Sequence, residues 1–221
     1  MSTVIPPHGF DALVRYVRAF IAVSKPRKPS RFLLWVDAVG SVLVCEASTV
    51  RLGQAVPGNP VELPLLADIS RHHATIRRDE GGYMIEPIRD VHIGSMSCRS
   101  TGVLPEGSLI ALGSSARLRF SRSHPLSATA RLDFASSHRT QPSADAVLLM
   151  ADTCVLGPAP GSHVVCRQWR QEVVLYRHEN ELFCRTAGSF EVDGVRHRER
   201  APLTLNSRIS GDGFSFSLEE V

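Results

Sequence analysis

The sequence contains no long apolar run: none reaches the roughly 18 residues that a membrane-spanning helix needs. It also shows no short apolar segment followed by a small-residue cleavage site near its start, so we expect no secretory signal. Together these absences predict a soluble protein of the cytoplasm. With 221 residues, 43% of them hydrophobic, the chain is long enough for two domains of about 100 residues each.

Cysteine is scarce and irregularly spaced. The five cysteines are an odd number and include no C-x-x-C pair, whereas a disulfide framework or a zinc ribbon needs regular spacing. We therefore expect buried free thiols. His72, His73 and His92 are the best candidates for a metal site, but neighbouring residues on a strand point to opposite faces. We predict neither a metal nor a cofactor.

Beyond its first 31 residues, the chain has no excess of positive charge. Residues 1–31 hold six Lys or Arg and one Asp, whereas residues 32–126 hold nine of each sign and residues 127–221 hold ten basic and twelve acidic side chains. A nucleic-acid-binding domain usually has a strongly basic face. The charge distribution therefore predicts no nucleic-acid partner.

The N-terminal segment carries the one helical pattern. Apolar residues recur every three or four positions between Phe10 and Ser24, and the prolines of Lys25-Pro-Arg-Lys-Pro29 end the pattern. We predict a short helix and a basic linker over residues 1–30, with the helix packing on the first domain. The alternative is a helix that binds a partner or an anionic membrane surface.

After Ser30 no further helical pattern of 10–15 residues is present, and short β-rich runs alternate with turn residues. This texture predicts an all-β fold and disfavours a parallel α/β sheet. The predicted strands are Phe32–Asp37, Val42–Cys45, Thr49–Leu52, Ala74–Arg78, Tyr83–Pro87, Leu109–Leu112, Arg117–Ser121 and Ala130–Phe134.

The second half of the chain repeats the plan of the first. The segment starting at Val42 is echoed by the segment starting at Val147, and an offset of 99 residues then relates several apolar and turn positions. The matched pairs are Ile76 with Leu175, Arg78 with Arg177, Glu80 with Glu179, Tyr83 with Leu182, and Ile110 with Ile209. An internal duplication explains this pattern, and coincidence between two unrelated β domains is the alternative. We predict domains at 31–126 and 127–221.

Motifs of catalysis are missing. The chain has no Gly-x-Ser-x-Gly nucleophile turn and no phosphate-cradling glycine-rich loop ahead of a helix. A triad drawn from Ser70, His73 and Asp68 would rest on closeness in the sequence alone. We therefore expect a binding protein and not an enzyme.

Two separated segments, Val50-Arg-Leu-Gly-Gln54 and Ser70-Arg-His-His-Ala-Thr-Ile76, resemble the core motifs of the forkhead-associated (FHA) phosphopeptide-binding family. The ending Leu104-Pro-Glu-Gly-Ser-Leu-Ile-Ala-Leu-Gly113 resembles the family's closing motif, with Ser108 where Asp is usual. The resemblance spans about residues 32–121. It implies two tandem FHA-like (SMAD/FHA-type) β-sandwiches, the second one degenerate.

The resemblance also implies a site. Ser70 and Arg71 would bind the phosphate, Gly53 would shape a turn, His73 would brace the loop, and the pair Gly94-Ser95 would contact the peptide main chain. Gln54 stands where the family has arginine, so it would add an uncharged donor. Arg51 is a further candidate for the missing charge.

The implied function is a phosphothreonine-peptide-binding adaptor in Ser/Thr-kinase signalling, whose partner is a phosphorylated protein or the kinase itself. The alternative is a degenerate FHA scaffold that binds a partner protein independently of phosphate. In the second half, Trp169, Arg170 and Glu172 replace the phosphate motif, and Asp193-Gly194 reads as a tight hairpin turn. The basic stretch Arg196–Arg200 reads as a solvated face, with an acidic or phosphate-bearing partner as the alternative.

Overall fold

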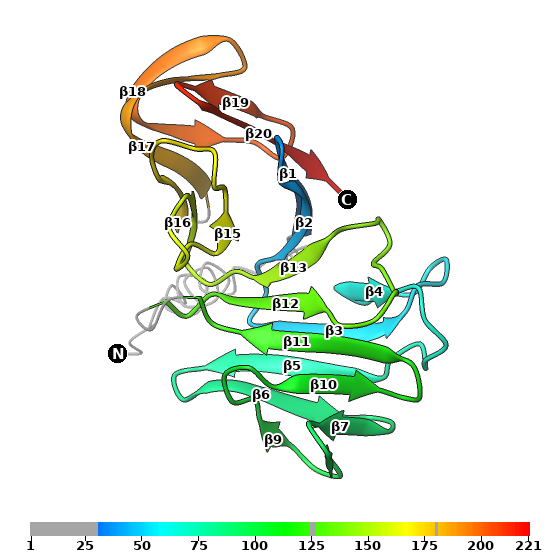
Figure 1. Ribbon diagram of the computed structural model, residues 1–221. Helices are drawn as coiled ribbons and strands as arrows, with labels where there is room; N and C mark the ends of the chain where they lie inside the picture. Colours follow the sequence, from blue (N-terminus) through cyan, green and yellow to red (C-terminus); the bar gives the residue numbers. More distant parts are fainter. Residues whose placement is uncertain (1–30, 124–126, 180) are drawn as a thin grey trace, which may run out of the picture.

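The computed structural model describes residues 31–123, 127–179 and 181–221, and these residues form twenty β-strands and no helix (Figure 1). The predicted all-β class is therefore confirmed. The helix and basic linker predicted for residues 1–30 lie outside the described residues.

One layer of the first half is a separate five-stranded sheet, ordered β4-β3-β5-β6-β9. Alternate residues such as Leu52, Ile76 and Ile85 are fully buried, because successive side chains of a strand point to opposite faces. The strands of this sheet are β3 (Thr49–Gln54), β4 (Leu63–Leu65), β5 (Ala74–Asp79), β6 (Gly82–Pro87) and β9 (Gly102–Val103).

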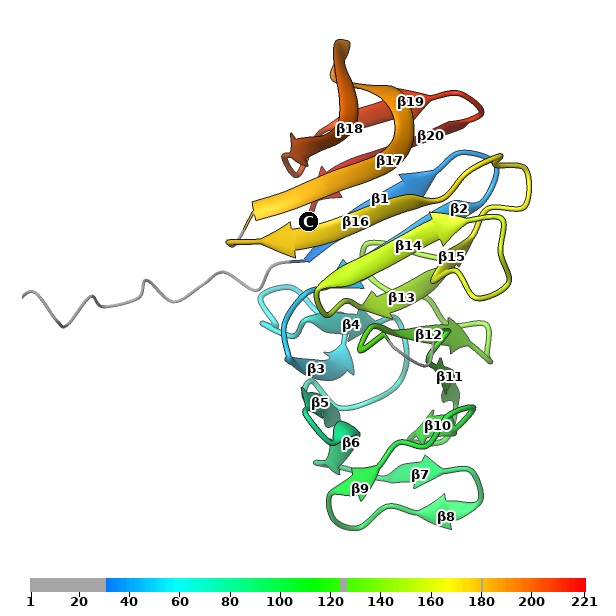
Figure 2. The same cartoon turned by 90° about the vertical axis from the view of Figure 1, so that its left-hand side faces the viewer.

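All other strands belong to one 15-stranded sheet. Figure 2 shows it running the length of the molecule, from β19 and β20 through β1, β2, β13 and β12 to β10, β7 and β8. The part of this sheet that faces the five-stranded sheet consists of β13 (Ala146–Leu149), β12 (Ala130–Phe134), β11 (Ala116–Ser121), β10 (Leu109–Leu112), β7 (Val91–Ile93) and β8 (Met96–Ser97).

The remaining part of the large sheet curves around the second core. It continues from β2 through β1, β20, β19, β17, β16 and β14 to β15, and β18 pairs with β17. These strands are β1 (Arg31–Val36), β2 (Gly40–Cys45), β14 (Thr153–Gly157), β15 (Val164–Val165), β16 (Val173–His178), β17 (Glu181–Val192), β18 (Val195–Leu203), β19 (Arg208–Gly211) and β20 (Phe214–Glu220).

The first hairpin of each half pairs with the last strand of the other half. Strand β1 is hydrogen-bonded to β20, and β12 is hydrogen-bonded to β11, in both cases antiparallel. The two hairpins meet where β2 runs parallel to β13, with Val42 beside Ala146. The β1–β2 and β12–β13 hairpins are therefore exchanged between the halves of one chain.

Because of this exchange, β2 and β13 are buried on both faces. Val42 and Val44 point into the core that contains Trp169, whereas Leu43 points into the core that contains Phe120. The boundary predicted between domains 31–126 and 127–221 thus separates the two repeats in sequence. It does not separate the two cores, since each core includes a hairpin from the opposite half.

The internal repeat is visible in the strand positions. The offset of 99 residues carries β5 onto β16 and β10 onto β19. The pairing of the next strands is also the same in the two halves. Leu52 of β3 pairs in parallel with Leu63 of β4, and Leu156 of β14 pairs in parallel with Val164 of β15. The two halves therefore share one strand plan, apart from the long β17–β18 hairpin.

Candidate functional site

The candidate site lies in the loop between β4 and β5, residues 66–73, beside the end of β3. The amide of Gln54 donates to the carbonyl of Ser70 at 3.0 Å, and the amide of His73 donates to the carbonyl of Leu52 at 2.8 Å. A Cβ atom on Gly53 would lie 1.7 Å from the carbonyl oxygen of Arg71. Only glycine lets the loop approach the strand this closely.

His73 connects this loop to a second one. Its side chain is buried, its Nδ1 accepts a hydrogen bond from the amide of Ser70 at 3.2 Å, and its Nε2 lies 2.9 Å from the carbonyl oxygen of Asp90. A carbonyl can only accept, so Nε2 carries the proton and the ring uses both nitrogens. His73 thus links the β4–β5 loop to the residue that precedes β7.

Asn59 is a third support that the sequence did not reveal. Its side-chain amide donates to the carbonyl of Gln54 at 2.9 Å and to the carbonyl of Arg71 at 2.7 Å. It therefore ties the β3–β4 loop to the β4–β5 loop. No motif marks such a residue, because an Asn in a Pro- and Gly-rich turn has many other uses.

The side chains of Ser70 and Arg71 have no such support. Within the described residues, neither the hydroxyl of Ser70 nor the guanidinium of Arg71 takes part in a hydrogen bond or an ion pair. Arg71 is exposed, and Ser70 and Gln54 are half-buried. The loop thus combines a fixed main chain with donor side chains that face solvent.

Gly94 and Ser95 do not belong to this site, so this part of the prediction is wrong. They form the turn between β7 and β8, at the end of β7 where the amide of Gly94 donates to the carbonyl of Leu109. The candidate loop lies at the other end of β7, where the amide of Gly113 donates to the carbonyl of Asp90. Asp90 and Gly94 are four positions apart along an extended segment, which corresponds to about 13 Å.

A second loop, residues 88–90 between β6 and β7, contacts the candidate loop. The amides of Ile88 and Arg89 both donate to the carbonyl of His73 at 3.0 Å. Arg89 is exposed and brings a second guanidinium to this end of the sandwich. The sequence does not indicate Arg89, because the family resemblance assigns the peptide contact to Gly94 and Ser95, several residues later.

Arg51 forms an ion pair with Glu62, outside the candidate loop. Its guanidinium and amide bind both carboxylate oxygens of Glu62, at 2.7 to 3.0 Å. Burial alone would raise the pKa of Glu62, but the hydrogen bonds and charge of Arg51 outweigh burial and hold that pKa below its usual value. Arg51 therefore anchors the β3–β4 loop and is not a free phosphate ligand.

The exchanged hairpin also supports the site. In its loop, Thr140 forms a β-bridge with Leu65, the amide of Leu66 donates to the carbonyl of Arg139 at 2.8 Å, and the amide of Gln141 donates to the carbonyl of Pro64 at 3.0 Å. The strand that leads into the candidate loop is thus held by a segment of the second half.

Within its described residues, the second half has no equivalent of the site. By the offset of 99, Trp169 corresponds to Ser70, and it is buried against Phe214 with ring centroids 5.4 Å apart. Arg170 lies 3.7 Å from Asp212. Asp193 and Gly194 join β17 to β18 with positive φ angles of 54° and 80°, as expected for a tight hairpin turn.

Of the three histidines considered for a metal, His72 and His73 are used in hydrogen bonds, and His92 Nδ1 lies 3.7 Å from a carboxylate oxygen of Asp90. His72 Nε2 lies 2.8 Å from the hydroxyl of Thr75, and both nitrogens of His73 are occupied as described above. Among the residues that the structure describes, no group of three or more His, Cys, Asp or Glu side chains is arranged to hold a metal ion.

Comparison with known proteins adds no relative: no family model, no curated protein and no solved structure matches the chain. Over the described part of the chain, no helix has the length and apolar character needed to span a membrane.

Proposed function

We propose that this protein is a non-enzymatic adaptor that binds a phosphothreonine peptide at the loops of its first, FHA-like sandwich. One observation carries the proposal. The main chain of the β4–β5 loop is fixed by Leu52, Asn59 and His73, while the hydroxyl of Ser70 and the guanidinium of Arg71 make no hydrogen bonds within the described residues.

These groups suit a phosphate. A phosphothreonine carries about −1.5 to −2 charges and three acceptor oxygens, and its best partners are charged donors. Ser70 supplies a hydroxyl, Arg71 supplies a guanidinium, and Gln54 supplies an amide from the adjoining strand end. Arg89 adds a second positive charge at the same end of the sandwich, in place of the arginine that the family has at the position of Gln54.

Gly53 and His73 act through the loop and not on the ligand. The loop needs a fixed shape before binding, because ordering it on binding would cost conformational free energy. The partner of such a site is a phosphorylated protein of a Ser/Thr-kinase pathway, or the kinase itself. The proposal needs no cofactor and no chemical step, and it places the protein in the cytoplasm.

The test is a titration of the full chain with a phosphothreonine peptide library, next to the same peptides without phosphate. We expect binding only to phosphorylated peptides, and we expect Ser70→Ala and Arg71→Ala each to weaken it by about tenfold or more, because charge-assisted bonds are lost. Ser95→Ala and Arg77→Ala are the matched controls, since both side chains lie away from the candidate loop and are exposed.

A second candidate function is phosphate-independent protein binding by a degenerate scaffold. The uncharged Gln54 and the buried Trp169 of the second half favour it. In the same titration, equal affinity for phosphorylated and unphosphorylated peptides would support this alternative and overturn the phosphate-reading function.

A further inference from the structure

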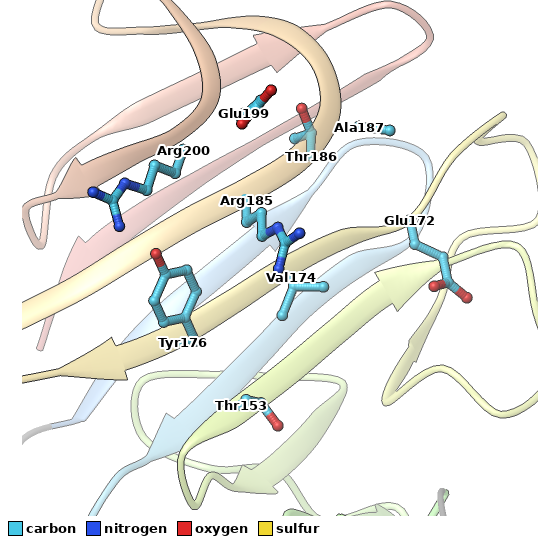
Figure 3. Close-up of a pocket in the computed structure, with 9 residues that line it drawn as sticks. All are labelled: Thr153, Glu172, Val174, Tyr176, Arg185, Thr186, Ala187, Glu199 and Arg200. Atoms are coloured by element: carbon cyan, nitrogen blue, oxygen red, sulfur yellow. The ribbon is translucent and has the colours of Figure 1, made fainter.

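A groove of the second half lies far from the proposed phosphate site. It has a volume of about 1000 Å³ and lies on the outer face of β14, β16, β17 and β18 (Figure 3). Val174, Tyr176 and Thr186 form its floor and walls, with Arg185, Arg200, Glu172 and Glu199 around them.

Two arginines meet across this groove. Arg185 of β17 and Arg200 of β18 are directly paired in the register of the two strands. Their Cβ atoms are therefore about 5 Å apart, and like charges at such positions destabilise a sheet. Both side chains are exposed, and within the described residues neither makes an ion pair or a hydrogen bond. Glu172 and Glu199 line the same groove, but within the described residues neither forms an ion pair with Arg185 or Arg200.

The strand that carries Arg200 holds two more arginines. Arg196 and Arg198 also lie on β18, paired with Glu191 and Ser189. The irregular register between Arg185 and Ser189, with Glu199 at a φ of 65°, bends the hairpin over the groove. Among the described strands, β18 pairs only with β17, so its outer edge is open.

An apolar surface lies beside the arginines. Tyr176 stacks on Phe183 with ring centroids 5.5 Å apart, and both rings are only half-buried. Figure 3 shows Arg200 and Tyr176 at one side of the groove, Arg185 above Val174 in the middle, and Glu172 at the opposite side. A ligand with acidic side chains around an apolar one would match this order of charge and apolar surface.

We infer that this groove is a second binding site, for an acidic segment of a partner protein in extended conformation. Carboxylates of the segment lie between Arg185 and Arg200 and relieve their repulsion, and an apolar side chain of the segment lies on Val174 and Tyr176. This inference does not depend on the phosphate site, because its ligand contains no phosphate.

The test uses a fluorescent peptide of alternating Glu and Leu, and the same peptide with Gln in place of Glu, titrated against the full chain by fluorescence anisotropy. We expect binding of the Glu peptide alone, weakened by added salt. Arg185→Gln with Arg200→Gln should lower the affinity by about tenfold or more. The control pair is Arg117→Gln with Arg119→Gln, which removes the same charge from exposed positions on β11 and should leave the affinity unchanged.

Two further measurements make the test decisive. The Arg185→Gln, Arg200→Gln protein should unfold at the same or a higher temperature than the native chain, since repulsion is removed, so that lost binding cannot come from lost folding. Conversely, Glu172→Gln with Glu199→Gln should tighten binding of the Glu peptide. No binding of the Glu peptide, equal binding of the Gln peptide, or an equal loss in the control pair would overturn the inference.

Discussion

Gly53 is the residue on which the close packing of the candidate loop depends. Any Cβ atom there would collide with the main chain of Arg71, and main chain cannot move aside as a flexible side chain can. We expect Gly53→Ala to destabilise the protein by about 2–4 kcal/mol and to weaken phosphopeptide binding. Thermal unfolding measures the first effect. Gly188→Ala is the control, because a Cβ on Gly188 meets no atom within 4 Å, and it should change stability little.

The cysteines provide a second prediction at the scale of single residues. Burial raises the pKa of Cys45, Cys154 and Cys184 to about 12 and that of Cys166 to about 11, so these thiols hold almost no thiolate at neutral pH. Desolvation also raises the pKa of Cys98, but its side chain is only half-buried and is therefore the most accessible of the five. At pH 8 the native protein should therefore react with a thiol reagent at Cys98 first, and the unfolded protein at all five. Rapid labelling that persists in Cys98→Ser would contradict the buried positions.

At the scale of elements, the sequence predicts the four- to six-residue strands of the first half well and the short ones poorly, and it delimits no strand after Ala130–Phe134. Strands of four to six residues, such as β5 and β11, show alternating apolar residues between clear turns, and both were predicted to within two residues. The strands β4, β7, β8 and β9 have two or three residues, too few for a period to appear.

The shortness of β7 also explains why the family resemblance assigns the peptide contact to Gly94 and Ser95 and not to residues 88–90. Ser70, Arg71 and His73 belong to one contiguous motif, so the sequence locates them directly. The second loop follows β6 and precedes the three-residue β7, and nothing in the local pattern distinguishes residues 88–90 from the next turn at Gly94 and Ser95. Only the hydrogen bonds of His73 identify the correct loop.

The ion pair that ties β3 to the β3–β4 loop makes stability depend on pH. The pKa of Glu62 is lowered in the folded protein, whereas the unfolded carboxyl titrates near 4.5. The stabilisation is therefore complete above pH 4.5 and is lost as the pH falls through the lower folded value. Glu62→Gln should lower stability at pH 7 by about 1–2 kcal/mol and should reduce its dependence on pH below 4.5.

Denaturant unfolding at several pH values checks this expectation. Glu86→Gln is the matched control, since Glu86 forms an exposed, 3.8 Å pair with Arg77 and should contribute little. If the stability of Glu62→Gln falls with acid as steeply as that of the native chain, other carboxylates cause the pH dependence and the expectation is wrong.

At the scale of the whole molecule, the sequence pattern does not predict the exchange of hairpins. The two halves repeat one strand plan, so the β1–β2 and β12–β13 hairpins have similar apolar patterns, and so do the last strands, β11 and β20. The pattern alone therefore does not show which hairpin pairs with which last strand. One signal was present: the runs at Val42–Cys45 and Ala146–Leu149 are entirely apolar, and such runs are typical of strands buried on both faces. Two separate sandwiches would each leave one face of these strands exposed.

The exchange predicts that neither half folds alone. A fragment of residues 1–126 lacks the β12–β13 hairpin that closes the core around Phe120, and a fragment of residues 127–221 lacks the β1–β2 hairpin that closes the core around Trp169. Each fragment alone would expose a large apolar face, so we expect no cooperative thermal unfolding from either. Mixed or co-expressed, the fragments should form a one-to-one complex with a single transition, and circular dichroism with sedimentation would detect it. If either fragment instead unfolds cooperatively as a monomer, its own hairpin has folded back onto its own core, and the exchange is then not required for folding.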